Sequence, residues 1–309
     1  MLPIGPVAAI DCGTNSTRLL VSDWMGKPVE RLMRITRLGQ GVDATGSLAT
    51  EAMERCTAVL RDYRGVMDRL GVVRGRLVAT SAVRDASNGD EFLAAASAAS
   101  GFEAELLAGT EEGRLSLAGA VSELDPDQGP FLVLDIGGGS TELVTGASAD
   151  DPDLAAASLQ VGCVRITERV LHSDPPTADE LEQAETMVGE LLESALADQP
   201  AFLGAHTLVG LAGTVTTLSA LNMGLDEYDR SRIHHSVLTI EEVAAWYRTL
   251  AAEVTVARLD RAGMVPGRED VIAGGALILF VVMTRLGLDR CLVSESDILD
   301  GMVAGLLVR

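Results

Sequence analysis

The sequence predicts an α/β protein of two duplicated domains that face a central cleft. One pattern occurs twice: an apolar strand ends in an aspartate, glycine and hydroxyl residues follow, and the chain turns back as a second strand. The first copy contains Asp11-Cys12-Gly13-Thr14-Asn15-Ser16, and the second contains Asp135-Ile136-Gly137-Gly138-Gly139-Ser140-Thr141. Because prolines and glycines interrupt the chain between the copies, we expect domains at 1–125 and 126–309, with a last helix able to pack back on the first domain.

Each half is expected to open with three strands, which short apolar runs predict. In the first half, Ala52, Cys56, Val59 and Tyr63 then show the spacing of a helix. The elements expected in this half are strands at 7–10, 18–24 and 29–38, a helix at 51–70, a strand at 77–80, a helix at 90–100, a strand at 103–107, and a helix at 111–124 with Thr110 as its N-cap.

The second half repeats the opening and then becomes mainly helical. Its expected elements are strands at 131–134, 142–145 and 156–160, helices at 162–171 and 179–197, a strand at 208–211, helices at 214–221, 241–253 and 271–286, a strand at 292–293 and a closing helix at 298–308.

Composition and charge exclude several classes of function. A chain of 309 residues that is 47% hydrophobic and only 3% aromatic can bury two mainly aliphatic cores. Its formal charge of −21 repels nucleic acid, so we expect no nucleic-acid partner. Lys27 is the single lysine and no Gly-x-x-x-x-Gly-Lys-Ser/Thr loop occurs, which excludes P-loop phosphate chemistry.

The sequence also predicts a cytoplasmic protein without a membrane segment. No apolar run reaches the ~20 residues that span a bilayer, and the N-terminal stretch lacks the basic region of a signal peptide. Cys12, Cys56, Cys163 and Cys291 are scattered, which favours buried free thiols in a reducing compartment.

The two aspartate-glycine-hydroxyl loops have the composition of phosphate-binding sites. Glycine lets the backbone turn sharply, so that free N–H groups and hydroxyls converge on an anion. Asp11 and Asp135 would repel phosphate, which predicts a divalent cation between them, and Mg²⁺ suits such a site. A third loop, Ala212-Gly213-Thr214, enters a helix whose N-terminus favours anions. Each loop alone is also compatible with an ordinary glycine-rich turn; two matched loops favour a phosphate site.

Charged residues between the loops are candidates for catalysis. Arg84 follows a strand and could bind a phosphate with two hydrogen bonds. Glu111 and Glu112 open a helix, where one carboxylate can stabilise the dipole while the other faces the cleft as a base. His234-His235 would need further ligands for zinc, and the nearby sequence shows none.

At these residues the chain resembles the exopolyphosphatase / guanosine pentaphosphate phosphohydrolase family, and it looks closest to the short, two-domain members of actinobacterial type. The most specific run is Leu134-Asp135-Ile136-Gly137-Gly138-Gly139-Ser140-Thr141-Glu142. The other matching runs start at Ala9, Ala79, Gly109, Gly162, Ala212 and Ser294, and they follow the family's order along nearly the whole chain.

The resemblance implies an actin-like ATPase (ribonuclease H-like) fold with a phosphate cleft between the halves. It implies Glu112 as the base that activates water, Arg84 as a phosphate ligand, and Asp135 and Glu142 around the metal. The cation expected between the paired loops makes Asp11 a further candidate ligand of Mg²⁺. The residues expected to bind phosphate in the three loops are Asp11, Gly13, Thr14, Asn15, Ser16, Gly137, Gly138, Gly139, Ser140, Gly213 and Thr214.

The expected activity is release of terminal orthophosphate from inorganic polyphosphate, by Mg²⁺-assisted attack of a water that Glu112 activates. Hydrolysis of guanosine pentaphosphate at its 5′ end uses the same parts and stays open. A small-molecule kinase would need an acceptor-binding insertion that the sequence does not show, and a non-catalytic alarmone sensor is disfavoured by the intact Glu112 and Arg84. The resemblance also makes a homodimer one option.

An acidic enzyme must bind an acidic substrate through local arginines. The first half offers Arg18 and Arg84 for this. In the second half, a track along polyphosphate could use Arg165 and Arg169, one helical turn apart, and Arg230 with Arg232. They could equally be surface arginines that offset the many carboxylates.

Overall fold

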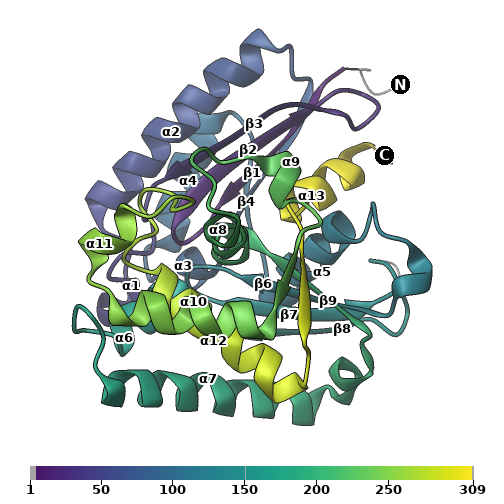
Figure 1. The fold of residues 1–309 in the computed structure, drawn as a ribbon. Coiled ribbons are helices and arrows are strands. Elements are labelled where there is room, and N and C mark those ends of the chain that lie inside the picture. Colours follow the sequence, from purple (N-terminus) through teal and green to yellow (C-terminus); the bar gives the residue numbers. More distant parts are fainter. Residues whose placement is uncertain (1–4, 150, 308–309) are drawn as a thin grey trace.

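The computed structural model describes residues 5–149 and 151–307 and contains two mixed β-sheets, one above the other in Figure 1. The first sheet has the order β3-β2-β1-β4-β5, and the second has the order β10-β11-β9-β6-β7-β8. The strands of the first sheet are β1 (Val7–Cys12), β2 (Ser16–Ser22), β3 (Pro28–Ile35), β4 (Arg74–Ala79) and β5 (Ala104–Leu106). Those of the second are β6 (Phe131–Ile136), β7 (Thr141–Gly146), β8 (Ala155–Leu159), β9 (Thr207–Leu211), β10 (Val237–Thr239) and β11 (Arg290–Val293).

The two sheets repeat one topology. In each, the first three strands pair antiparallel in sequence order, and a later strand joins the first strand in parallel: β4 beside β1, and β9 beside β6. A fifth strand extends each sheet in parallel, β5 beside β4 and β11 beside β9. β10 is an addition at the edge of the second sheet. The predicted duplicated α/β architecture is therefore confirmed. Residue 125 lies in the chain between β5 of the first sheet and β6 of the second, and a domain boundary there stays a prediction.

Helices cover both faces of each sheet. The first half contains α1 (Val42–Thr45), α2 (Thr50–Arg69), α3 (Ser81–Arg84), α4 (Gly89–Ser100) and α5 (Gly109–Ala120). The second contains α6 (Cys163–Arg169), α7 (Ala178–Asp198), α8 (Ala212–Met223), α9 (Arg230–Ile233), α10 (Ile240–Ala252), α11 (Thr255–Leu259), α12 (Ile272–Leu286) and α13 (Ile298–Leu307). Short 3₁₀ turns lie at Pro126–Gln128 and Pro200–Gly204.

The buried strands β1 and β6 send alternate side chains to opposite layers. Ala8 and Ile10 of β1 pack under α2 and α4, whereas Val7 and Ala9 contact α13. In β6, alternate residues likewise face the large core under α7, α8, α10 and α12 or the smaller core under α5. Each strand is therefore apolar throughout, which is why both could be predicted from short apolar runs.

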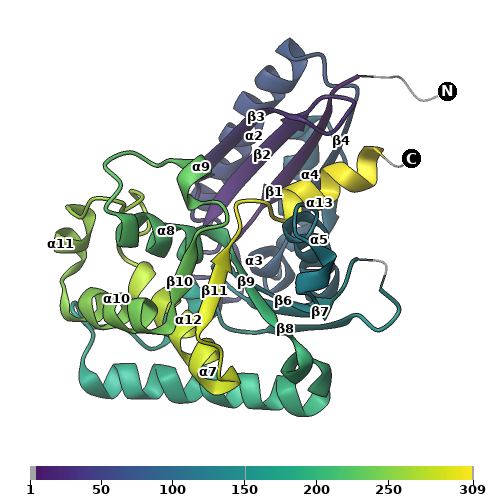
Figure 2. The same ribbon diagram turned by 45° about the vertical axis from the view of Figure 1, so that its right-hand side comes forward.

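Helices α5 and α13 lie side by side between the two sheets (Figures 1 and 2). Their backbones touch at glycines: a Cβ placed on Gly119 would lie 1.9 Å from the Asp297 carbonyl oxygen, and one on Gly301 would lie 2.1 Å from the Leu115 carbonyl oxygen. The last helix, α13, thus packs against the first sheet and against α5, the helix that carries Glu112.

Several local predictions were wrong. Helix α5 starts at Gly109 with Ala108 as its N-cap, because the N–H groups of Glu111 and Glu112 already bond the Ala108 carbonyl; Thr110 is therefore inside the helix. The segment after β4, for which no helix was predicted, forms the short helix α3. Strand β10 was not predicted. The expected end of the closing helix at Val308 lies outside the described residues. Within the described residues, no helix combines the length and apolar character needed to cross a membrane.

Candidate functional site

Two matched turns face each other where the sheets meet. The turn between β1 and β2 is closed by the N–H of Gly13, which donates to the Ser16 carbonyl at 3.0 Å. The turn between β6 and β7 has the same bond, from Gly137 to Ser140, also at 3.0 Å. A Cβ placed on Gly138 would lie 2.9 Å from the Cβ of Thr14, so the two turns approach as closely as glycine allows. The duplicated motifs therefore form one site.

A narrow cleft of about 70 Å³ runs between these turns. The third predicted loop reaches it through Ala212 and Gly213 at the start of α8, where the first N–H groups have no partner within the helix. The residues that line the cleft are Asp11, Gly13, Thr14, Asn15, Ser16, Arg18, Thr80, Ser81, Glu112, Asp135, Ile136, Gly137, Gly138, Gly139, Ser140, Cys163, Ala212, Gly213 and Arg268.

Three of the expected site residues lie behind the wall of the cleft. Thr214 is 2% exposed and packs against α12, where a Cβ on Gly275 would be 2.5 Å from its hydroxyl. Glu142 is 1% exposed and accepts a hydrogen bond from Ser158 at 2.8 Å. Arg84 does not line the cleft and donates to the carboxylate of Glu112 at 2.8 Å. Direct contact of these three with substrate therefore stays a prediction.

Glu112 is the glutamate of the tandem pair that lines the cleft; Glu111 does not. One nitrogen of Arg84 donates both to a Glu112 carboxylate oxygen and to the Leu107 carbonyl, each at 2.8 Å. Burial raises the pKa of Glu112 to about 7, although Arg84 opposes the shift. A carboxyl group with this pKa can accept a proton from water near neutral pH and release it again.

Buried carboxylates dominate the floor of the cleft. One oxygen of Asp11 accepts hydrogen bonds from Arg18 at 2.6 and 3.0 Å, and the other, Oδ1, is buried without a hydrogen-bond partner among the described residues. Asp135 accepts a hydrogen bond from Ser116 at 2.8 Å, and burial raises its pKa to about 6. Burial, followed by the charge of Glu112, also raises the pKa of Glu142.

This donor set fits a hard divalent cation. Asp11 and Asp135 both line the cleft, their oxygens are buried, and the partnerless Oδ1 of Asp11 would be costly without a cation or donor beside it. Oxygen ligands of this kind suit Mg²⁺. Glu142 is the direct cross-strand partner of Asp135 and does not line the cleft, but it adds negative charge beside the site.

Arg18, one of the arginines expected to help bind the acidic substrate, lines the cleft, and so does Arg268, which was not expected there. Arg18 is the direct cross-strand partner of Asp11, so the hairpin register in the sequence could have revealed it. Arg268 comes from the segment before α12, and a Cβ on Gly213 would lie 1.4 Å from one of its nitrogens. No short-range sequence signal connects Arg268 to the third loop. Among the described residues it forms no ion pair.

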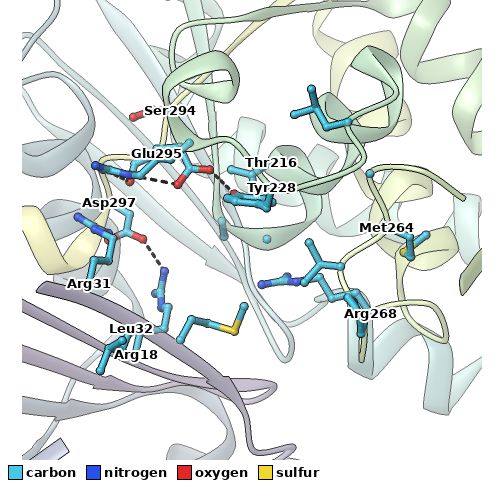
Figure 3. A pocket seen from close by; sticks show the side chains of 18 of the residues that line it. Arg18, Arg31, Leu32, Thr216, Tyr228, Met264, Arg268, Ser294, Glu295 and Asp297 are labelled. Atoms are coloured by element: carbon cyan, nitrogen blue, oxygen red, sulfur yellow. Dashed lines mark hydrogen bonds and ion pairs between the residues drawn. The ribbon is translucent and has the colours of Figure 1, made fainter.

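The cleft opens into a larger cavity of about 650 Å³ that shares Arg18, Arg268, Ala212 and Gly213 with it. In Figure 3 the guanidinium groups of Arg18 and Arg268 enter this cavity from opposite sides. The remaining wall mixes apolar side chains with charged ones. It includes Leu32, Met33, Leu225, Tyr228, Met264, Val265, Pro266, Glu295 and Asp297.

The arginines proposed as a polyphosphate track are mostly paired with carboxylates. Arg165 bonds Asp85 and lies 3.7 Å from Asp43, and Arg169 donates to Asp43 at 2.8 Å. These contacts join α6 of the second half to the first half. Arg230 donates to the backbone carbonyl of Glu295 at 2.9 Å and lies 3.4 Å from its carboxylate, whereas Arg232 is exposed. For Arg165, Arg169 and Arg230, the geometry favours a structural use over a free basic track.

The histidine pair has one further potential ligand, Glu123, which lies 2.8 Å from Nε2 of His234. The Nδ1 atom of His234 accepts the N–H of Glu295 at 3.0 Å. A neutral ring that accepts at Nδ1 carries its proton at Nε2, which then donates to Glu123. Neither ring nitrogen of His234 therefore has a free lone pair to bind a metal.

Comparison with known proteins agrees with this geometry. The model of the Ppx/GppA phosphatase family matches residues 21–309. The chain belongs to this family. It is 46% identical over 317 residues to exopolyphosphatase 2 of Mycobacterium tuberculosis, covering 97% of this chain and 98% of the relative.

Solved structures of the family have the same fold. One exopolyphosphatase-like protein is 38% identical with a TM-score of 0.92, over 98% of this chain and 99% of that one. The Aquifex aeolicus family member is 32% identical with a TM-score of 0.79, over 99% of both chains. The predicted family is thus confirmed, and so is its two-domain α/β fold.

Proposed function

We propose that the chain is an exopolyphosphatase that releases terminal orthophosphate from inorganic polyphosphate. The observation that carries this proposal is the position of Glu112, a carboxyl group with a pKa of about 7 that lines the same cleft as two matched phosphate-type turns. The similarity to a curated exopolyphosphatase over nearly the whole of both chains supports the substrate.

In the proposed reaction, the turns at Gly13–Ser16 and Gly137–Ser140 hold the terminal phosphate through backbone N–H groups and hydroxyls. Glu112 takes a proton from a water molecule, whose oxygen attacks the terminal phosphorus. The bond between that phosphorus and its bridging oxygen breaks, which releases orthophosphate and a chain one unit shorter. Little covalent chemistry is asked of the protein, because phosphoryl transfer depends mainly on positioning and on neutralising charge.

Asp11 and Asp135 would hold Mg²⁺, with Glu142 adding charge behind Asp135. When bound, this ion would neutralise phosphate oxygens and so allow a polyanion to approach the carboxylates. Arg18 and Arg268 are placed to bind phosphate oxygens on the side of the larger cavity. Arg84 acts on the base: by donating to Glu112 it keeps the carboxyl from staying protonated near neutral pH.

Hydrolysis of guanosine pentaphosphate is the second candidate, and the larger cavity favours it. Its volume of about 650 Å³ and its apolar and aromatic wall are typical of a site for a small organic group. Polyphosphate has no such group. A nucleoside in this cavity would place its phosphates toward Arg18, Arg268 and the cleft. No feature of the described residues favours a kinase or a non-catalytic sensor over these two hydrolases.

Phosphate release from polyphosphates of several lengths, guanosine pentaphosphate and ATP, measured in parallel with Mg²⁺, tests the proposal. We expect the highest kcat/KM with polyphosphate. A higher kcat/KM with guanosine pentaphosphate would transfer the assignment to the second candidate, and release from none of them would contradict a hydrolase. The cytoplasmic location and the homodimer stay predictions; the four buried free cysteines are compatible with the former.

A further inference from the structure

Helix α5 carries more of the site than the base alone. Glu112, Gly113 and Ser116 occupy one face of this helix, since residues one turn apart lie above one another. A Cβ on Gly113 would lie 2.5 Å from a methyl carbon of Val144 and 3.4 Å from the Cβ of Glu142. The helix is therefore packed against β7 at the level of the carboxylates, which brings Ser116 behind Asp135, outside the lining of the cleft.

The Ser116 hydroxyl contacts the carboxylate of Asp135. Its Oγ donates to Oδ2 at 2.8 Å, and both side chains are buried, with exposed fractions of 0% and 6%. Asp135 lies in a cluster with Asp11 and Glu142, where like charges repel and side-chain donors are few. Within the described part of the chain, Ser116 is the side chain that donates a hydrogen bond to Asp135.

We propose that Ser116 is a positioning residue for the divalent cation, an inference that rests on the proposed function. By binding Oδ2, the hydroxyl fixes the rotation of the Asp135 carboxylate and leaves the other oxygen for the cation. Hydrogen-bonding partners of metal ligands orient those ligands and commonly change metal affinity when they are removed. Ser116 has no route to the substrate of its own, since it does not line the cleft.

The placement of Ser116 also links the cation to the base. Glu112 and Ser116 are four residues apart on a single rigid helix, so the base and the orientation of Asp135 are set by the same element. A small misplacement of catalytic groups can greatly lower the rate. Placing Glu112 and Ser116 on one helix keeps the base and the metal ligand in a fixed relative position. This would explain why a hydroxyl residue stands at a fully buried helix position.

Ser116→Ala tests the proposal by metal binding, without any substrate. The free protein would be titrated with Mn²⁺, as a spectroscopic stand-in for Mg²⁺, and the unbound ion followed by electron paramagnetic resonance. We expect an affinity about 10–100-fold weaker than that of the unaltered protein. Ser122→Ala is the matched control: this hydroxyl, just beyond the same helix, donates to the Gly119 carbonyl at 2.8 Å, and its loss should leave the affinity unchanged.

A double-mutant cycle separates positioning from a general structural effect. In an Asp135→Asn background, Ser116→Ala should weaken Mn²⁺ binding no further, because the two residues act together. If Ser116→Ala is poorly folded by circular dichroism, Ser116→Cys keeps the size with a weaker donor and should give an intermediate affinity. Unchanged Mn²⁺ affinity in a folded Ser116→Ala or Ser116→Cys protein would overturn the proposal.

The outcome is independent of the substrate assignment. If polyphosphate is hydrolysed while Ser116→Ala binds Mn²⁺ normally, the positioning role fails and the proposed function stands. If Ser116→Ala weakens Mn²⁺ binding but the unaltered protein releases no phosphate, the positioning role stands and the proposed function fails.

Discussion

Two opposing influences set the protonation of Glu112. Burial disfavours the carboxylate and raises its pKa, whereas the guanidinium of Arg84, 2.8 Å away, favours the carboxylate and lowers it. The result is a pKa of about 7. A general base works best when its pKa lies near the working pH, because it is then both deprotonated and sufficiently basic.

Arg84→Met should move the acid limb of the pH profile of kcat/KM to higher pH. Removing the cation takes away the influence that lowers the pKa of Glu112, so a larger fraction of the protein is protonated and inactive at neutral pH. Arg84→Lys keeps a positive charge and should move the limb less. A limb at the same pH in the folded Arg84→Met protein would show that Arg84 does not tune the base.

Single residues of the site were predictable where the hairpins repeat and unpredictable where the fold brings distant segments together. Asp11 and Asp135 follow from the matched motifs. The hairpin register pairs Asp11 with Arg18 and Asp135 with Glu142, so the two copies differ in charge at one equivalent position. Arg268 reaches the cleft from the segment before α12, and no motif near it in the sequence predicts a role in the site.

At the level of elements, the contact between α5 and α13 holds the helix of the base in place. The two helices meet through Gly119 and Gly301, whose missing side chains let backbone touch backbone. The sequence predicted a helix at 111–124 and a closing helix at 298–308, which correspond to α5 and α13. It could not predict that the two helices pack against each other, because a glycine within a helix can also simply lower the helix propensity of the segment.

Gly301→Ala should destabilise the protein and lower kcat. The new Cβ would lie 2.1 Å from the Leu115 carbonyl oxygen, so α5 must shift and Glu112 with it. Overpacking of this kind costs about 1–3 kcal/mol in the free energy of unfolding. Thermal unfolding and steady-state kinetics would measure both effects.

Gly305→Ala is the control within the same helix. A Cβ at this position meets nothing within 4 Å, so the better helix propensity of alanine should stabilise the protein, by up to about 1 kcal/mol. Equal Tm values for the two variants would contradict the proposed close contact.

Over the whole molecule, ion pairs bridge the two halves beside the cleft. Arg37 lies 2.9 Å from Asp270, Arg165 bonds Asp85, and Arg169 bonds Asp43, each pair joining the first half to the second. The duplication in the sequence predicted two halves that face one another. It did not predict which ion pairs join them, because an arginine that binds substrate and an arginine that forms an ion pair cannot be told apart in a sequence.

Combined Arg165→Ala and Arg169→Ala should therefore affect polyphosphates of every length alike. If these arginines hold the two halves together, their loss weakens the contact between the halves. It should then lower kcat equally for polyphosphates of every length. Arg248→Ala, an exposed arginine of α10, should have no effect. A KM that rises with chain length in the double variant, while kcat is unchanged, would instead support the substrate track.

The central claim is that Glu112 activates water in the cleft between the halves. Glu112→Gln keeps the size and removes the basicity, and Glu111→Gln makes the same change at the neighbour that does not line the cleft. In Mg²⁺-dependent phosphate release from polyphosphate, we expect Glu112→Gln to lower kcat about 10²–10⁴-fold and Glu111→Gln to leave it nearly unchanged. Near-normal kcat in a folded Glu112→Gln protein would contradict the account.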